Sequence, residues 1–125
     1  MNIIIKLINY PKRLLIKSKF ISKQNLKDRF SIIHKNNYWD NSETVSGPGS
    51  TMKNTVNLRK KLKKIIKKYK IKSIFDAPCG DCNWIKGIIR NSSVKYIGAD
   101  IVDEIIKKNK KKFNYKNTFF YKKDI

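Results

Sequence analysis

Histidine and cysteine are scarce in this chain of 125 residues, which contains one His and two Cys. One histidine beside a single cysteine pair leaves a four-ligand zinc site incomplete, and two cysteines cannot build a disulfide framework. No apolar run approaches the length needed to cross a bilayer, and no secretory signal is recognisable. We therefore expect a cytoplasmic protein with no metal site and no transmembrane segment.

Acidic residues are also few, because 9 Asp and Glu stand against 30 Lys and Arg, a formal net charge of +21. Such a charge suggests nucleic acid as a partner first and an anionic membrane surface second. However, 26 of the basic residues are lysine, whereas arginine suits bidentate phosphate and guanine contacts. Lys, Ile and Asn share A/T-rich codons, so genome composition also explains the bias. A basic nucleic-acid-binding module stays open as an alternative, without a recognition motif to support it.

Composition divides the chain into a basic amino-terminal extension, residues 1–37, and a second part, residues 38–125, with ordered apolar patterns. The only histidine, His34, is expected in a loop or on the surface. Residues 36–51 are rich in Asn, Gly and Pro and predict a loop. Residues 53–70 predict an amphipathic helix with lysines on its polar face. Its apolar face comprises Leu58, Leu62, Ile65, Ile66 and Tyr69.

Short apolar strands alternate with helices in the rest of the chain. Strands are predicted at residues 73–77, 94–99 and 119–123, and helices at 83–90 and 102–112. This alternation implies right-handed βαβ crossovers and a parallel sheet. We therefore predict an α/β fold, a Rossmann-like doubly wound parallel sheet truncated after its third strand. Because three parallel strands leave edges and much of a face uncovered, we expect the chain to be a fragment, a truncated gene product or one half of an assembly, and to be inactive by itself.

Three acids, Asp76, Asp100 and Asp124, fall at the carboxyl ends of the predicted strands, each 24 residues after the one before. In an open α/β sheet, ligands bind outside those strand ends, where an acid after the second strand can accept hydrogen bonds from ribose hydroxyls. Asp is also common where strands become loops. Three acids in register with a glycine turn at Gly80 nevertheless favour a ligand site.

The segments around these acids resemble motifs of class I S-adenosylmethionine-dependent methyltransferases. Asp-Ala-Pro-Cys-Gly-Asp at residues 76–81 resembles their first motif, and in one bacterial branch that motif has the same sequence. Tyr-Ile-Gly-Ala-Asp-Ile at 96–101 and Phe-Tyr-Lys-Lys-Asp-Ile at 120–125 resemble the second and third motifs. Upstream, Trp39 and the Ser-Gly-Pro-Gly-Ser segment at 46–50 are similar to the approach to the motif in that branch.

The resemblance implies an enzyme that uses S-adenosyl-L-methionine, with residues 38–125 as a partial cofactor-binding domain. The turn after the first strand would pass the methionine part of the cofactor, with Asp76 orienting the turn or meeting the ammonium group. Asp100 would hold the ribose hydroxyls, and Asp124 would face the adenine amino group. The implied cofactor-binding residues are Asp76, Ala77, Pro78, Cys79, Gly80, Asp100, Ile101, Asp124 and Ile125.

Some parts of the assignment stay open. Ile101 and Ile125 are placed to pack on the adenine ring, but ordinary core packing accounts for them equally well. The catalytic residues and the methyl acceptor, a small molecule or a glycan, are not indicated, because in this family they commonly follow the third strand. The general first motif has three glycines, whereas Pro78 and Cys82 stand at two of those positions here.

Two other functions compete for the same turn. Cys79 and Cys82 form a Cys-x-x-Cys pair between a strand and a helix, as in thioredoxin-like redox proteins. The thioredoxin family places a cis-proline after this pair, but all three prolines of this chain precede Cys82. A dinucleotide-binding domain would need Gly-x-Gly-x-x-Gly in the turn, where this chain has only Gly80.

Overall fold

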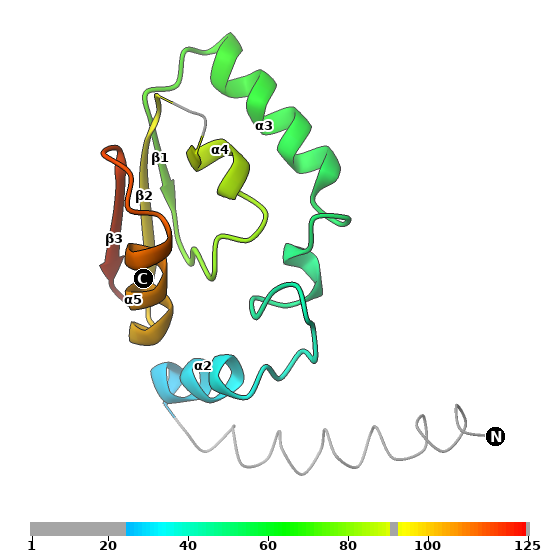
Figure 1. Cartoon of the computed structure of the whole chain (residues 1–125), viewed down its shortest axis with the longest axis vertical. Helices are drawn as coiled ribbons and strands as arrows, with labels where there is room; N and C mark the ends of the chain where they lie inside the picture. The colour runs from blue at the N-terminus through cyan, green and yellow to red at the C-terminus, as the bar shows by residue number, and fades with distance from the viewer. Residues whose placement is uncertain (1–24, 91–92, 125) are drawn as a thin grey trace, which may run out of the picture.

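The computed structural model describes residues 25–90 and 93–124 (Figure 1). The first 24 residues of the expected extension and Ile125 therefore lie outside the described residues. None of the described helices is long and apolar enough to cross a membrane. In chain order the elements are α2 (Leu26–Lys35), η1 (Pro48–Ser50), α3 (Val56–Lys68), β1 (Ser73–Asp76), α4 (Lys86–Arg90), β2 (Lys95–Asp100), α5 (Asp103–Lys112) and β3 (Thr118–Lys122).

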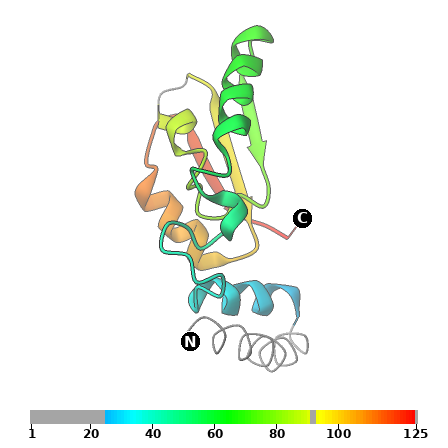
Figure 2. The same cartoon turned by 90° about the vertical axis from the view of Figure 1, so that its right-hand side faces the viewer.

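The three strands form one parallel sheet in the order β1-β2-β3, with a helix between successive strands. This arrangement confirms the predicted α/β fold with a parallel sheet. The register aligns Phe75 with Ile97, and Ile97 with Phe119. Because the strands run the same way, their carboxyl ends meet at one edge of the sheet, and α2 lies across that edge (Figures 1 and 2).

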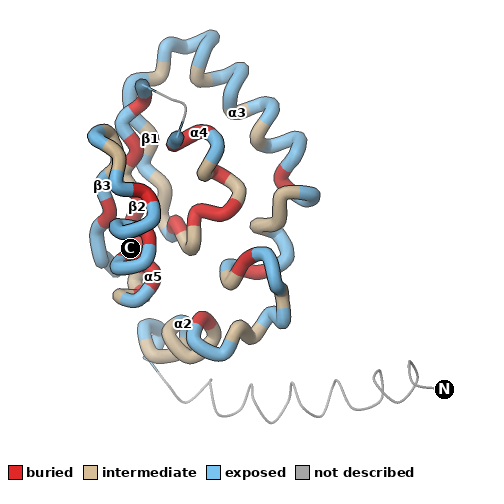
Figure 3. Tube along the Cα trace, in the orientation of Figure 1, coloured by how far each residue is buried: buried red, intermediate tan, exposed pale blue. Residues whose placement is uncertain are grey.

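The core lies between one face of the sheet and the helices. Tyr96 of β2 and Phe120 of β3 point into it, with ring centroids 5.8 Å apart. Buried residues gather in β2, in the turn before α4 and on one side of α5 (Figure 3). The core cluster contains Cys79, Cys82, Ile85, Ile88, Ile89, Tyr96, Ile106, Phe113 and Phe120.

The opposite face of the sheet is open. Phe75, Phe119 and Tyr121 alternate with the core residues along β1 and β3, and they are 62%, 37% and 54% exposed. The expectation that much of one sheet face is left uncovered therefore holds for the described residues.

Helix α3 buries less of its apolar face than its periodicity predicts. Leu62 and Ile66 pack against the core, but Leu58, Ile65 and Tyr69 are exposed. The helix thus contacts the core along a single line of residues, one per turn. Amphipathic periodicity identified the helix but overestimated how much of its apolar face is covered.

Candidate functional site

The turn after β1 is held against the end of β2 by backbone hydrogen bonds. The amide of Cys79 donates to the carbonyl of Ala99 at 2.8 Å, and the amide of Gly80 donates to Oδ2 of Asp100 at 3.0 Å. Gly80 has φ +52°, and a Cβ there would lie 2.2 Å from Oγ of Ser46. Glycine is therefore required by the left-handed backbone and by the close approach of the preceding loop.

The side chain of Asp100 connects the glycine turn to the start of α5. Its Oδ2 accepts from Gly80, and its Oδ1 accepts from the amide of Val102 at 3.0 Å. The carbonyl of Asp100 accepts from the amide of Lys123 at 3.0 Å, which ties in the end of β3. Since a carboxylate offers about four acceptor positions, Asp100 retains capacity for the hydroxyl groups of a ligand.

Asp81 holds the loop that precedes α3 onto the same turn. Its carboxylate accepts from Oγ1 of Thr44 at 2.8 and 2.9 Å, from the amide of Val45 at 3.0 Å and from Oγ of Ser46 at 3.0 Å. The sequence placed Asp81 in the first motif without indicating this role. These hydrogen bonds join residues 35 to 37 positions apart, so no local sequence pattern predicts them.

A second contact between the loop and the turn involves Glu43. Its Oε1 accepts from Nδ2 of Asn83 and from the amide of Met52, each at 2.7 Å. The hydrogen bonds from Asn83 and from Met52 hold the pKa of Glu43 below its usual value. Two carboxylates thus join the loop to the turn: that of Asp81 in the turn and that of Glu43 in the loop.

A cavity of about 400 Å³ opens at the carboxyl ends of the strands. Volumes of this size accommodate small-molecule ligands and cofactors. Six of the nine residues predicted from sequence line it, namely Pro78, Cys79, Gly80, Asp100, Ile101 and Asp124. Asp76 and Ala77 are not among the described lining residues, and Ile125 lies outside the described residues.

Much of the remaining wall comes from residues that the sequence did not place at the site. Helix α2 and the loop after it supply an apolar surface, and Trp84 also lines the cavity, as Trp39 does. Trp39, Ser46 and Ser50 had been singled out only through the upstream resemblance. The lining residues of α2 and this loop are Leu26, Phe30, Ile33, His34, Trp39, Val45, Ser46 and Ser50.

His34 corrects an expectation. It lies within α2 and is only 7% exposed, rather than being in a loop or on the surface. The helix places it on the side that lines the cavity. A single polar residue near the end of a helix gives no sequence signal for this position, because burial here depends on how α2 crosses the sheet edge.

The charge of the cavity differs from that of the chain. Among the described residues, the lining contains two carboxylates, Asp100 and Asp124, and one ammonium group, Lys123. The whole chain carries a formal charge of +21. A cavity with more acidic than basic side chains favours a neutral or cationic ligand over a polyanion.

Asp76 is used inside the fold. Its Oδ2 accepts a hydrogen bond of 2.6 Å from the hydroxyl of Tyr96 on the helix-covered face of the sheet. Burial raises the pKa of Asp76, and the hydrogen bond from Tyr96 partly opposes this shift. The carboxyl group of Asp76 therefore links β1 to β2 and is not part of the cavity lining.

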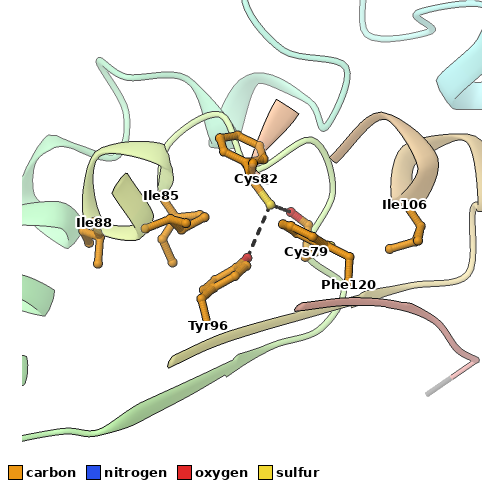
Figure 4. Packing of buried hydrophobic residues seen from close by; sticks show 9 residues of the cluster. Cys79, Cys82, Ile85, Ile88, Tyr96, Ile106 and Phe120 are labelled. Atoms are coloured by element: carbon orange, nitrogen blue, oxygen red, sulfur yellow. Dashed lines mark hydrogen bonds between the residues drawn. The ribbon is translucent and has the colours of Figure 1, made fainter. Parts of the chain in front are cut away.

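The two cysteines are free and buried. Sγ of Cys82 lies 3.4 Å from the hydroxyl of Tyr96 (Figure 4). It also lies 3.5 Å from Nδ2 of Asn109. The neighbouring Cys82 thiol and burial both raise the pKa of Cys79. A reactive redox cysteine has a lowered pKa and partial exposure, so the Cys79 thiol has the opposite character.

Comparison with models of known protein families gives no match, and no curated protein matches the chain. Across residues 25–90 and 93–124, no three His, Cys, Asp or Glu side chains gather as a metal-binding group. Functional inference therefore depends on the cavity and on the residues that form it.

Proposed function

We propose that this chain is the cofactor-binding part of an S-adenosylmethionine-dependent methyltransferase. The observation that carries the proposal is the cavity at the carboxyl ends of the parallel strands. It brings together the glycine turn and the acids Asp100 and Asp124, which the motif resemblance had selected independently. Ligands of open α/β sheets bind at this edge.

In this proposal four of the lining residues have chemical tasks. The Gly80 turn receives the methionine part of the cofactor, since the backbone there carries no side chain. Asp100 accepts hydrogen bonds from the ribose hydroxyls through the acceptor positions left free by its two backbone contacts. Ile101 packs against the adenine ring, and Asp124 receives the adenine amino group.

The charge of the cavity supports this ligand class. S-adenosylmethionine carries a sulfonium and an ammonium group against one carboxylate, so it is cationic overall. The cavity offers Asp100 and Asp124 against Lys123. A nucleoside phosphate would instead meet net repulsion from these carboxylates, because it carries several negative charges.

The competing redox function has less support. Both thiols are buried, and the raised pKa of Cys79 disfavours the thiolate form that a nucleophilic redox cysteine needs. The left-handed backbone at Gly80 and the close approach of Ser46 explain this glycine without invoking the cysteines.

The test is a titration of the 125-residue chain with S-adenosylmethionine and S-adenosylhomocysteine. Both tryptophans of the chain, Trp39 and Trp84, line the cavity, so the intrinsic fluorescence reports on it directly. We expect a saturable response to both compounds and a much weaker one to ATP. A chain that shows no saturable response, confirmed by calorimetry, would contradict the proposal.

A matched pair of variants locates the binding. Asp100→Asn should weaken S-adenosylhomocysteine binding about tenfold or more, because hydrogen bonds to charged groups contribute about 1.5–3 kcal/mol each. Asp103→Asn should leave binding unchanged, since Asp103 lies on α5, pairs with Lys107 and does not line the cavity. Unfolding curves of both variants check that the fold is retained.

A further inference from the structure

A second cavity, of about 690 Å³, lies at the amino ends of β1 and β2, at the edge of the sheet opposite α2 (Figure 1). The end of α3 and the segment before β1 form one side of it, and α4 and the segment before β2 form the other. Its lining includes Lys63, Lys67, Lys70 and Lys72, and none of its described lining residues is acidic. We call it the basic cavity.

The acidic residues of the chain lie away from the basic cavity. All nine belong to the described residues, whereas residues 44–75 contain ten basic residues and no acid. None of the four cavity lysines makes an ion pair within the described part of the chain. The dipole of α3 favours Lys67 in its last turn, but it does not account for Lys63 or Lys72, which lie outside that turn. Like charges that share a cavity repel one another, and an anionic ligand relieves this repulsion.

Lys70 occupies a backbone position that glycine normally fills. Helix α3 ends in a Schellman motif, in which the amide of Ile71 donates to the carbonyl of Ile66 at 3.0 Å and the amide of Lys70 donates to that of Lys67 at 3.4 Å. Lys70 has φ +50°, a left-handed conformation that disfavours a side chain. Lysine therefore adds an ammonium group to the cavity at a cost in stability that glycine would avoid. Strained positions of this kind cluster at ligand-binding sites.

The shape and extent of the basic surface indicate the kind of anion. On α3, Lys60 and Lys64 are exposed and each lies three positions before a lysine of the cavity, so they are its neighbours on the helix surface. A surface that continues beyond the cavity suits a polymer better than one small anion. A bilayer surface is flat and does not enter a cavity, and a duplex is too wide to enter it, whereas a flexible single strand fits. Lysine contacts phosphates as a point charge and reads no base sequence in doing so.

We propose that the basic cavity binds the phosphate backbone of a single-stranded nucleic acid, with its four lysines neutralising the phosphates. The aliphatic lining residues Ile66, Ile71 and Ile88 cover the sugar or base of the same nucleotide. This site does not depend on the proposed cofactor cavity, because the two lie at opposite edges of the sheet. A strand bound here is therefore not assigned as the methyl acceptor.

The test is the anisotropy of a labelled oligothymidylate titrated with the 125-residue chain at several salt concentrations. We expect saturable binding whose logarithmic affinity falls linearly with the logarithm of the salt concentration. The double variant Lys67→Gln/Lys72→Gln should weaken binding about tenfold or more at about 0.1 M salt and reduce the slope by about 0.7 for each lost phosphate contact. A chain that shows no saturable binding would overturn the inference.

A matched double variant controls for net charge. Lys27→Gln/Lys35→Gln removes the same charge from α2, at the opposite edge of the sheet. It should leave the slope unchanged and weaken binding far less. Equal losses for the two double variants would show that binding follows net charge alone, and the inference would be wrong. The affinity for S-adenosylhomocysteine should be the same in Lys67→Gln/Lys72→Gln as in the unmodified chain, so this site and the cofactor site are tested separately.

Lys70→Gly separates a binding role from a structural one. Glycine suits the left-handed backbone, so the variant should be more stable in urea unfolding than the unmodified chain. It should nevertheless bind the oligonucleotide more weakly and reduce the salt slope by about 0.7. A gain in stability without any loss of binding would show that Lys70 does not contact the strand and would count against the basic cavity as the site.

The same variants distinguish a nucleic acid from a membrane. Cosedimentation with vesicles that contain phosphatidylserine measures binding to an anionic bilayer. We expect any vesicle binding to fall to a similar extent in the two double variants, because a flat surface responds to the charge of the whole chain. Vesicle binding that is lost only in Lys67→Gln/Lys72→Gln, with oligonucleotide binding retained, would identify a membrane site and refute the inference.

Discussion

The backbone amide of Asp81 donates a hydrogen bond to Oγ of Ser46 at 2.9 Å, and the same hydroxyl donates to Oδ1 of Asp81 at 3.0 Å. This reciprocal contact closes the loop before α3 onto the glycine turn after β1. Because Ser46 and Val45 line the cavity, the contact also fixes one of its walls. The cavity therefore depends on Asp81, although Asp81 itself is not among its lining residues.

Replacing Asp81 should loosen this loop and lower the stability of the fold. Asp81→Ala removes a carboxylate that accepts from Thr44, Val45 and Ser46. We expect a loss of about 1.5–3 kcal/mol or more in the free energy of unfolding, the value of one or more hydrogen bonds to a charged group. Urea unfolding measures it. Asp103→Asn, which removes one exposed ion pair with Lys107, should change stability far less, because water and salt screen exposed ion pairs. Similar losses for both variants would contradict the assigned role of Asp81.

Gly80→Ala should be poorly tolerated. Its φ of +52° disfavours a side chain, and the added Cβ would lie 2.2 Å from Oγ of Ser46. We expect a destabilisation of about 1–3 kcal/mol from the strained backbone and the displaced loop. The matched control is Gly87→Ala in α4, where a Cβ would meet nothing within 4 Å. That change should be neutral or stabilise the chain by about 0.5–1 kcal/mol. Thermal unfolding measures the stability of both variants. Equal stability of Gly80→Ala and Gly87→Ala would contradict the close approach at Gly80.

The sequence was most informative where local periodicity and tertiary structure agree. The alternation of strands and helices predicted β1 to β3 and the helices between them. It was less informative where the outcome depends on how elements pack. The contacts of Asp81 join distant segments, and the burial of His34 depends on where α2 crosses the sheet edge. Neither is encoded in a local pattern.

The departure from the three-glycine motif is another feature whose structural consequence could not be predicted from the sequence. Pro78 and Cys82 occupy two glycine positions, and proline cannot adopt a left-handed backbone. The structure places the left-handed conformation at Gly80 and at Cys82, where φ is +55°. A non-glycine residue in this region is uncommon. The buried contacts of the Cys82 thiol with Tyr96 and Asn109 accompany this conformation, and they could not be read from the motif.

Asp76 should make the stability of the fold depend on pH with a defined sign. Burial raises its pKa in the folded state above the unfolded value, so the folded state binds the proton more tightly. Its contribution to stability is fully present below about pH 3.9, the unfolded pKa, and is lost as pH rises through the raised folded value. The difference in unfolding free energy between the unmodified chain and Asp76→Asn should therefore fall as pH rises through this window.

Asp103 provides the control for this measurement. Lys107 lowers the pKa of Asp103, so its contribution should be lost as pH falls, the opposite trend. Urea unfolding of the unmodified chain, Asp76→Asn and Asp103→Asn at a series of pH values tests both signs. A difference for Asp76→Asn that rises with pH would show that hydrogen bonding from Tyr96 outweighs burial at this carboxyl group.

The cysteines should be unreactive in the folded chain. Both are buried, and the neighbouring Cys82 thiol and burial raise the pKa of Cys79. We expect alkylation of both thiols to be slow under native conditions and fast in denaturant, because the thiolate is the reacting species. Cys82→Ser should leave the binding of S-adenosylhomocysteine nearly unchanged, since Cys82 does not line the cavity. Rapid native alkylation, together with disulfide reductase activity, would instead support a redox pair.

The open face of the sheet should drive self-association once its charge is screened. Phe75, Phe119 and Tyr121 form an exposed apolar surface on β1 and β3, the outer strands of the sheet that the described residues form, and such surfaces promote association. A net charge of +21 repels copies of the chain at low salt. At 0.1 M salt, repulsion between charges more than about 10 Å apart is largely screened. Sedimentation velocity should therefore show larger species as the salt concentration rises.

Phe75→Thr should reduce the amount of these larger species, because threonine retains strand propensity while removing the exposed ring. Its unfolding free energy should change far less than that of Phe120→Ala, which removes a core ring and should cost about 3–5 kcal/mol. Association that is independent of salt and unaffected by Phe75→Thr would place the contact surface elsewhere on the molecule.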